Sequence, residues 1–187
     1  MKSTQWIRIL SVKIIIAASA VLTACQMAPP GLDRENSLIN YQQLETADFN
    51  CRCETARLGG KVIRATALEN QTEVEVLSME VDRFSAKPIL ASSTNGRFIA
   101  VLNGFVDPLS LQDQYITVKG ILDGKRGGKI DQANYLYPVI KVEHYRIWQQ
   151  VIEYYRDEEE WADYWESRRY GGPWGPFPSI KTRAALR

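Results

Sequence analysis

Between Leu58 and Trp148, short hydrophobic runs alternate with polar turns. Within these runs hydrophobic and polar residues often alternate, as in 115–122, where Ile116, Val118 and Leu122 share one face. A period of two is typical of strands that bury one face. The pattern predicts strands at 61–66, 72–81, 97–102, 115–122 and 137–148, with a short segment at 129–131.

Two positions predict irregularities in these strands. Gly59-Gly60 opens the first strand and permits a bulge or a sharp bend. In the second strand the inward parity changes between Val76 and Leu77, which predicts a bulge there. Pro88 interrupts the next segment, so 84–94 is expected to be irregular.

Five or six bent antiparallel strands with short turns predict a small β-barrel over residues 57–148. An OB-like Greek-key barrel fits best, because a bent first strand marked by glycine is common in that fold. A two-sheet sandwich is the alternative, and the strand count favours the barrel. The predicted fold class is mostly β, with a C-terminal aromatic helix and an extended tail.

After Trp148 the period changes, and hydrophobic residues from Val151 to Trp165 recur three, four or seven residues apart. This spacing predicts a helix, whose other side is covered by the acidic run 157–160. Gly171-Gly172-Pro173 ends the helix, and Trp-Gly-Pro-Phe-Pro at 174–178 is predicted to be extended. We therefore expect residues 149–187 to hold one helix and an aromatic tail.

Aromatic residues are concentrated in this C-terminal part. Trp161, Trp165, Trp174 and Phe177 form a candidate interaction surface. Aromatic side chains near proline and glycine suit a partner groove, a membrane interface or a lid over the barrel. The lid and the membrane interface are the favoured roles.

Residues 1–24 are predicted to be a bacterial lipoprotein signal peptide. Basic residues precede an uncharged run from Ile14 to Ala24, which is short of the roughly 20 residues that a spanning helix needs. Leu22-Thr23-Ala24-Cys25 resembles a lipobox, so Cys25 is the predicted lipidation site and 25–56 the tether. An ordinary secretory peptide with an incidental cysteine, or an uncleaved anchor, is the alternative. Gln26 in place of Asp indicates, by resemblance to lipoprotein sorting, the outer membrane.

The charge balance argues against a nucleic-acid partner. The 187 residues include 23 Lys+Arg and 22 Asp+Glu, a formal net charge of +1. Removal of residues 1–24 takes away basic residues only, so the mature chain is slightly acidic. It therefore lacks the basic footprint of a dedicated nucleic-acid binder.

No sequence motif predicts an enzyme, a metal site or a cofactor. Signatures of nucleotide-binding loops, zinc proteases and serine hydrolases are missing from the sequence. Cys51 and Cys53 permit a disulfide in an oxidising compartment, although Cys-x-Cys closes a small, strained ring. A local staple or two incidental thiols is favoured over a redox pair. With His144 they would make only three metal ligands, at no recognised spacing.

Two further segments favour structural interpretations. His144 shares strand parity with Ile140 and Val142, so it is predicted to face inward as a core or rim residue, with Glu143 pointing away. The run 124–129, Gly-Lys-Arg-Gly-Gly-Lys, superficially resembles a phosphate-binding loop. It is predicted instead to be the solvated tip of a hairpin.

Several short segments together resemble one known family. They stand in order from the lipobox to the Trp-Gly-Pro tail: Gly59-Gly60-Lys61-Val62-Ile63, Ala86-Lys87-Pro88, Asn95-Gly96-Arg97-Phe98, Gly104-Phe105-Val106-Asp107-Pro108, Tyr115-Ile116-Thr117-Val118-Lys119-Gly120 and Tyr137-Pro138-Val139. In their order and spacing they resemble the Slp family of outer-membrane lipoproteins, the starvation-inducible lipoproteins of Gram-negative bacteria. The resemblance implies an envelope role in stress or stationary phase and carries over no catalytic residue. Cys51 and Cys53 are not part of this pattern.

The sequence leaves two main functional hypotheses and one minor one. The first is a non-enzymatic, lipid-anchored outer-membrane protein that contacts membrane, peptidoglycan-layer or protein partners. The second is a periplasm-facing module that binds a small ligand, glycan or lipid on the barrel face. An enzyme without a recognisable motif is the third.

Overall fold

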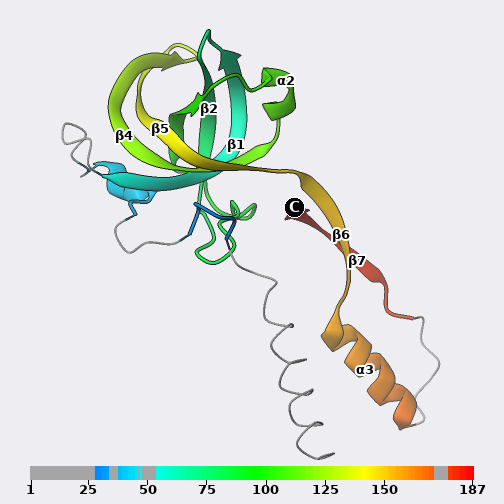
Figure 1. Ribbon diagram of the computed structural model, residues 1–187. Coiled ribbons are helices and arrows are strands. Elements are labelled where there is room, and N and C mark those ends of the chain that lie inside the picture. Colours follow the sequence, from blue (N-terminus) through cyan, green and yellow to red (C-terminus); the bar gives the residue numbers. More distant parts are fainter. Residues whose placement is uncertain (1–27, 34–37, 46, 48–53, 171–176) are drawn as a thin grey trace, which may run out of the picture.

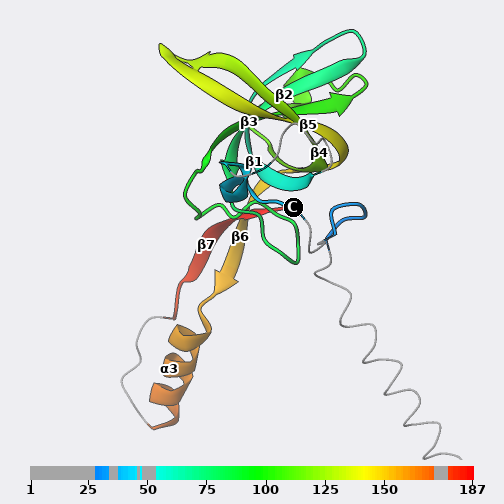
Figure 2. The ribbon, with the colours of Figure 1, turned by 90° about the vertical axis from the view of Figure 1, so that its left-hand side faces the viewer.

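The structure is a computed structural model that describes residues 28–33, 38–45, 47, 54–170 and 177–187 (Figure 1). Five strands wind into a barrel, and a two-stranded hairpin carries one helix away from it (Figures 1 and 2). The elements are η1 (Tyr41–Glu45), β1 (Thr55–Ala67), β2 (Gln71–Met79), β3 (Gly96–Asn103), α2 (Pro108–Leu111), β4 (Tyr115–Ile130), β5 (Ala133–Trp148), β6 (Gln150–Arg156), α3 (Glu158–Arg169) and β7 (Ile180–Leu186).

The five barrel strands close a ring in the order β1-β2-β3-β5-β4, with β4 paired back to β1. A five-stranded Greek-key ring of this kind is an OB-like barrel, so the predicted fold class is confirmed. One detail is wrong, because β3 and β5 pair in parallel rather than antiparallel. An odd number of strands cannot alternate in direction all round a closed ring, so one neighbouring pair must run in parallel.

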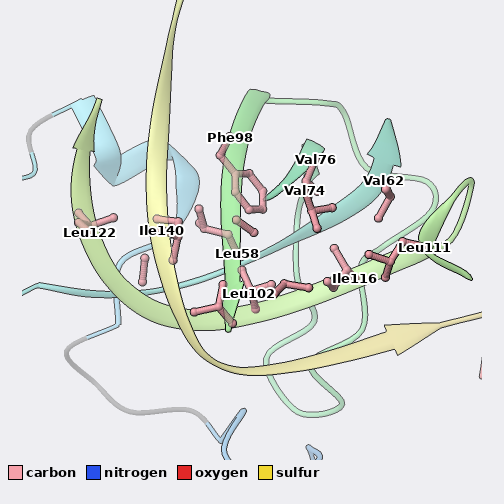
Figure 3. Close-up of a cluster of buried hydrophobic side chains, with 14 of the residues drawn as sticks. Leu58, Val62, Val74, Val76, Phe98, Leu102, Leu111, Ile116, Leu122 and Ile140 are labelled. Carbon is pink, nitrogen blue, oxygen red and sulfur yellow. The ribbon is translucent and has the colours of Figure 1, made fainter. Parts of the chain in front are cut away.

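The barrel core is built from inward side chains of all five strands (Figure 3). Val74 and Val76 of β2, Phe98 of β3 and Ile140 of β5 are fully buried. Along β2 every second residue is buried, so the period that predicted the strand also sets its inward face.

The bulge in the first hairpin lies on β1, not on β2. Val62 and Arg64 pair with adjacent residues of β2, so Ile63 between them is the extra residue. The bulge predicted at Leu77 is therefore wrong. Leu77 keeps an outward position, and Ser78 continues the buried row.

Two glycines let strand backbones approach closely. A Cβ on Gly60 would lie 1.9 Å from the carbonyl oxygen of Leu77, and one on Gly120 would lie 2.1 Å from that of Lys141. No side chain fits at such distances, so both positions require glycine.

The β4–β5 hairpin is longer than predicted. The predicted tip at 124–129 is wrong, since this segment continues β4, with Gly127 and Gly128 paired to Leu136 and Tyr135. The chain turns instead at Asp131, which has a φ of 51°. Aspartate tolerates this left-handed backbone better than most residues.

The elements β6, α3 and β7 form one projecting unit, which we call the arm. The helix predicted from Val151 is wrong over 151–156, because this segment pairs with β7 along its whole length. Its β-branched and aromatic residues are typical of strands. The helix begins at Glu158, where the Asp157 carboxylate accepts a hydrogen bond from the Glu160 N–H at 3.3 Å. The last seven residues of the predicted extended tail before Arg187 are a paired strand.

Candidate functional site

The outer surface of β1, β2 and β3 is the first candidate site, because OB-type barrels bind oligosaccharides and oligonucleotides on this face. The β4–β5 hairpin folds back towards these strands and leaves a cleft of about 230 Å³, which we call the barrel-face cleft. Its lining residues are Arg64, Thr66, Glu73, Glu75, Ile99, Arg126, Gly127, Gly128, Lys129 and Tyr137.

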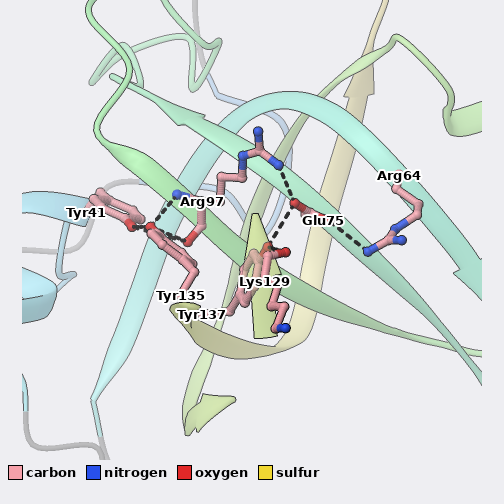
Figure 4. A network of polar contacts seen from close by, with 7 residues as sticks. All are labelled: Tyr41, Arg64, Glu75, Arg97, Lys129, Tyr135 and Tyr137. Carbon is pink, nitrogen blue, oxygen red and sulfur yellow. Dashed lines mark hydrogen bonds and ion pairs between the residues drawn. The ribbon is translucent and has the colours of Figure 1, made fainter. Parts of the chain in front are cut away.

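Glu75 is the centre of a polar network in this cleft (Figure 4). Its Oε1 accepts hydrogen bonds from Arg97 Nη1 at 2.8 Å and from the Tyr137 hydroxyl at 3.4 Å. Its Oε2 lies 3.2 Å from Arg64 Nη2. The carboxylate is thus already neutralised by the protein's own cations, and any ligand must compete with them.

The same contacts keep two of these groups protonated. The hydrogen bond to Glu75 raises the pKa of Arg97 above its ordinary value. Burial raises the pKa of Tyr137, and the nearby Glu75 carboxylate adds to the effect. Both side chains therefore remain hydrogen-bond donors at neutral pH.

Further contacts tie the β4–β5 hairpin to the barrel. The Arg126 guanidinium binds both carboxylate oxygens of Glu73, at 2.7 and 3.0 Å, which raises the pKa of Arg126. The Tyr135 hydroxyl accepts from the Arg97 N–H at 2.9 Å and lies 3.0 Å from the Tyr41 hydroxyl. The hairpin is therefore held against the face that an OB-type ligand would use.

The arm is the second candidate, and its base is fixed to the barrel. Tyr115, Trp148 and Leu186 form a small hydrophobic cluster there. The Trp148 indole N–H donates to Thr117 Oγ1 at 3.0 Å, and the Lys87 ammonium donates to the Leu186 carbonyl at 2.7 Å. Both strands of the arm are thus attached at the end where they leave the barrel.

At the far end of the arm, aromatic residues of α3 gather with a residue that precedes β7. We call this group, Trp161, Tyr164, Trp165, Arg168 and Phe177, the tip cluster. The ring centroid of Tyr164 lies 5.3 Å from that of Trp165 and 5.2 Å from that of Phe177. The Arg168 guanidinium lies within 6 Å of all three centroids, at 5.2, 5.9 and 5.7 Å, so cation–π attraction holds the group together.

The arm exposes much apolar surface for its size. Among the described residues, 14 large hydrophobic side chains are strongly exposed, and six of them lie on the arm or at its tip. These six are Ile152, Tyr154, Trp165, Tyr170, Phe177 and Ile180. Clustered exposed apolar residues mark interaction surfaces more often than scattered ones do.

The N-terminal side of the described chain meets the barrel close to the base of the arm. Leu32 is buried, and its carbonyl accepts from Arg57 Nη1 at 2.9 Å. A Cβ on Gly31 would lie 2.5 Å from the ring of His144, so this ring packs directly on the glycine. His144 stands four residues before Trp148 on β5.

The inward orientation predicted for His144 is wrong, because the side chain is exposed. Val142 pairs with Gly120 and His144 with Lys119, so Glu143 is an extra residue that reverses the parity of the strand. In the part of the chain that the structure describes, no three His, Cys, Asp or Glu side chains gather into a metal-binding group.

The structure brings three of the predicted interaction residues together, Trp161, Trp165 and Phe177, in the tip cluster. Four other predicted site residues lie outside the described residues: Cys25, Cys51, Cys53 and Trp174. Sequence reasoning missed Glu75 and its partners. The outward alternation of Glu73 and Glu75 on β2 was the available signal, but their partners come from strands that only the topology brings close.

Within the described residues, no helix has both the length and the apolar character needed to cross a membrane. A family model for the outer membrane lipoprotein Slp family matches residues 22–178. No solved structure is a significant match to the chain.

Three relatives are similar to the chain. An uncharacterized protein of Haemophilus influenzae is 46% identical over 143 residues, which are 76% of this chain and 78% of the relative. The uncharacterized lipoprotein YeaY of Escherichia coli is 34% identical over 66% of this chain and 62% of its own length. The outer membrane protein Slp of Escherichia coli is 25% identical over 86% of this chain and 89% of its own length.

Proposed function

Because the chain belongs to the outer membrane lipoprotein Slp family, we infer that this outer-membrane lipoprotein is a non-enzymatic contact protein of the bacterial envelope. In this proposal residues 1–24 are removed as a signal peptide, and acyl chains on Cys25 hold the protein to the membrane. Residues 25–56 tether the barrel. The protein then stabilises the envelope in stress or stationary phase by binding other envelope components.

The exposed aromatic surface of the arm is the observation that carries this proposal. An arm attached to the barrel at its base, with clustered aromatic side chains at its far end, is suited to a contact away from the barrel. By contrast, the charged groups on the barrel face are largely paired with one another.

The anchor is tested by the intact mass of the protein extracted from membranes in mild detergent. We expect a chain that begins at Cys25 and carries acyl groups, and we expect Cys25→Ala to leave the membrane fraction. An unacylated chain that begins at Met1 contradicts the anchor. The same spectrum reports whether Cys51 and Cys53 are oxidised.

The contact role is tested in cells that lack the gene. Wild type should restore survival in stationary phase and resistance to detergent with EDTA, whereas Trp165→Ser with Phe177→Ser should not. The matched control is Phe105→Ser with Leu109→Ser, which removes exposed apolar residues at the barrel end near α2 and should restore both. If the arm variant restores both phenotypes and Ala at His144, Cys51 or Cys53 abolishes them, the protein acts through chemistry instead.

The barrel-face cleft favours a second candidate function, binding of a small glycan. Tyr137 lines this cleft with a buried ring, and a Cβ on Gly128 would lie 2.8 Å from that ring, so the hairpin backbone packs directly on it. Guanidinium and carboxylate groups beside it are the polar groups that bind sugar hydroxyls. At about 230 Å³ the cleft is smaller than the roughly 300–1,000 Å³ of typical ligand pockets, so it suits a single sugar unit.

Binding of cell-wall amino sugars, followed by calorimetry or by NMR shifts, tests this second function. A sugar that binds should shift the amide signals of β2 and of the β4–β5 hairpin. Glu75→Gln removes the charge at the centre of the network and should weaken that binding about ten-fold, as expected for the loss of one charge-assisted hydrogen bond. Shifts confined to other parts of the protein would rule out the cleft.

A further inference from the structure

We propose that the tip cluster of the arm is a second membrane contact, which lies in the interfacial layer of the same bilayer that holds the acyl chains. This inference rests on the proposed function for the anchor on Cys25. It goes beyond that function by naming a phospholipid bilayer as the partner of the arm.

The aromatic and the acidic residues of α3 lie on opposite sides of the helix. Trp161, Tyr164, Trp165 and Arg168 recur three or four residues apart and share one side of the helix. The acidic residues Glu159, Asp163 and Glu166 recur at the same spacing on the other side. The aromatic side is therefore the one that can enter the lipid surface at the far end of the arm, while the acidic side stays in water.

The chemistry of the tip cluster matches the membrane interface rather than the bilayer core. Tryptophan and tyrosine are enriched where acyl chains meet headgroups, because their rings are apolar with one polar edge. Arg168 lies among the rings, with its guanidinium 5.2 Å from the centroid of Tyr164 and 5.9 Å from that of Trp165, so its charge is set against aromatic faces within the cluster. Trp165 and Phe177 are 51% and 66% exposed, so they are accessible to lipid.

The geometry brings the arm within reach of the bilayer. Six chain steps lead from Cys25 to Gly31, so this first part of the tether spans at most about 22 Å between the anchor and the barrel. The seven residues of β6 span about 23 Å and the 12 residues of α3 about 18 Å. In both views the segment 28–33 and the base of the arm lie at the same end of the barrel, and the arm extends away from that end (Figures 1 and 2). A barrel held this close to the membrane can place the far end of the arm in the lipid surface.

The charge of α3 distinguishes this contact from an electrostatic one. The helix carries the acidic residues Glu158, Glu159, Glu160, Asp163 and Glu166 against only Arg168 and Arg169. Its net charge is therefore negative, and attraction to an anionic polymer or an anionic headgroup cannot drive the contact. Apolar burial drives it, so the contact should persist at high salt.

Tryptophan quenching in vesicles tests the proposal on the full acylated protein. The protein is reconstituted into phosphatidylethanolamine–phosphatidylglycerol vesicles whose acyl chains carry bromine, and its emission is compared with that in unbrominated vesicles. Trp148 is buried at the base of the arm and should not be quenched. We expect the wild type to be quenched, and Trp165→Ser with Phe177→Ser to reduce the quenched fraction about two-fold or more, since two interfacial side chains have lost their apolar surface.

Flotation of the same vesicles separates the arm contact from the anchor. The control Phe105→Ser with Leu109→Ser should float and be quenched like the wild type, and circular dichroism checks that each variant is folded. The single variant Phe177→Ser keeps every tryptophan and should give an intermediate value. Protein that floats without quenching, or a double variant quenched like the wild type, overturns the arm contact and leaves the acyl anchor intact; the arm would then serve a protein or peptidoglycan partner. Wild type that does not float overturns both.

Discussion

The barrel and the arm use the same kinds of residues in opposite ways. In the barrel, Phe98 and Ile140 are fully buried, and on β2 the outward positions between the buried ones are mostly polar, such as Glu73 and Glu75. In the arm, Ile152, Tyr154 and Phe177 are mostly exposed, although β6 alternates in burial as a barrel strand does. The difference lies in what each sheet packs against, since the barrel closes on itself, whereas no second layer among the described residues covers the two-stranded arm.

An isolated two-stranded hairpin is marginal in water. The arm is supported at its base by Trp148 and Leu186, and at its far end by the packing of the tip cluster. Exposed apolar surface on a marginal element is costly unless it has a partner. The barrel is therefore the part that specifies the fold, and the arm is the part suited to contact with a partner.

Truncation of one phenylalanine in each region gives the sharpest contrast. Phe98→Ala removes the largest fully buried side chain and should lower the free energy of unfolding by about 3–5 kcal/mol. Phe177→Ala in the arm should change it by no more than about 0.5 kcal/mol, since the ring is mostly in solvent. Urea denaturation followed by circular dichroism measures both. Equal losses for the two variants would mean that the arm is part of the cooperative barrel fold.

A methyl group added at a strand contact is the next largest perturbation. Gly60→Ala places a Cβ against the Leu77 carbonyl and should destabilise the barrel by about 2–3 kcal/mol, because the β1 and β2 backbones must separate. Gly127→Ala is the matched control, since a Cβ there meets nothing within 4 Å, and it should be nearly neutral. Thermal melts of the two variants and the wild type provide the measurement. A stable Gly60→Ala would show that close backbone approach does not limit closure of the barrel.

The barrel could be predicted from the sequence because its signal is local. Burial on one face imposes a period of two, and that period located β2, β4 and β5, whereas the run at 97–102 that became β3 is apolar on both faces. Bulges were not predictable in the same way. Ile63 and Glu143 shift the register of one strand against another, so their effect depends on a partner strand, and the orientation of His144 was wrong for that reason.

The arm shows where sequence pattern alone fails. From Val151 to Tyr155, helical and strand periods are both compatible with the residues, and only pairing with β7 decides between them. The segment 180–186 carries little alternation of its own, so it was expected to be tail. The ion pair of Glu73 likewise depends on the tertiary fold, because its partner Arg126 lies on β4, which is not a neighbour of β2 in the ring.

The β4–β5 hairpin offers a smaller test within the barrel. Arg126→Ala removes the pair with Glu73, whose side chain is 22% exposed, and should cost about 0.5–1 kcal/mol, the range of partly exposed ion pairs. Amides of residues 124–136 should then exchange faster with deuterium, while those of Val74 and Val76 should not change. Arg126→Lys keeps the charge without the two parallel hydrogen bonds and should be intermediate. Uniform acceleration across the barrel would show that the hairpin is integral to the core.

Acid pH should loosen the arm while the barrel stays folded, which is the mildest way to separate the two. The hydrogen bond from Lys181, at 2.7 Å, holds the pKa of Asp157 below its ordinary value of 3.8, and the pair raises the pKa of Lys181 above 10.5. A carboxyl whose pKa is lowered on folding stabilises the fold at any pH above its pKa in the unfolded chain. It loses that contribution as the pH falls through its lower pKa in the folded protein. A lysine whose pKa is raised on folding stabilises the fold at any pH below its pKa in the unfolded chain. It loses that contribution as the pH rises through its higher pKa in the folded protein. The contact between α3 and β7 is therefore complete between about pH 4 and pH 10.

Below that window amides of α3 should exchange faster, by a small factor, with no change at Val74 or Phe98. Asp157→Asn keeps a helix cap but cannot ionise, so the acid dependence of its α3 exchange should shrink to the part that comes from the second pair of Lys181, with Glu160 at 3.3 Å. An unchanged pH dependence in that variant would place the sensitive group elsewhere in the arm.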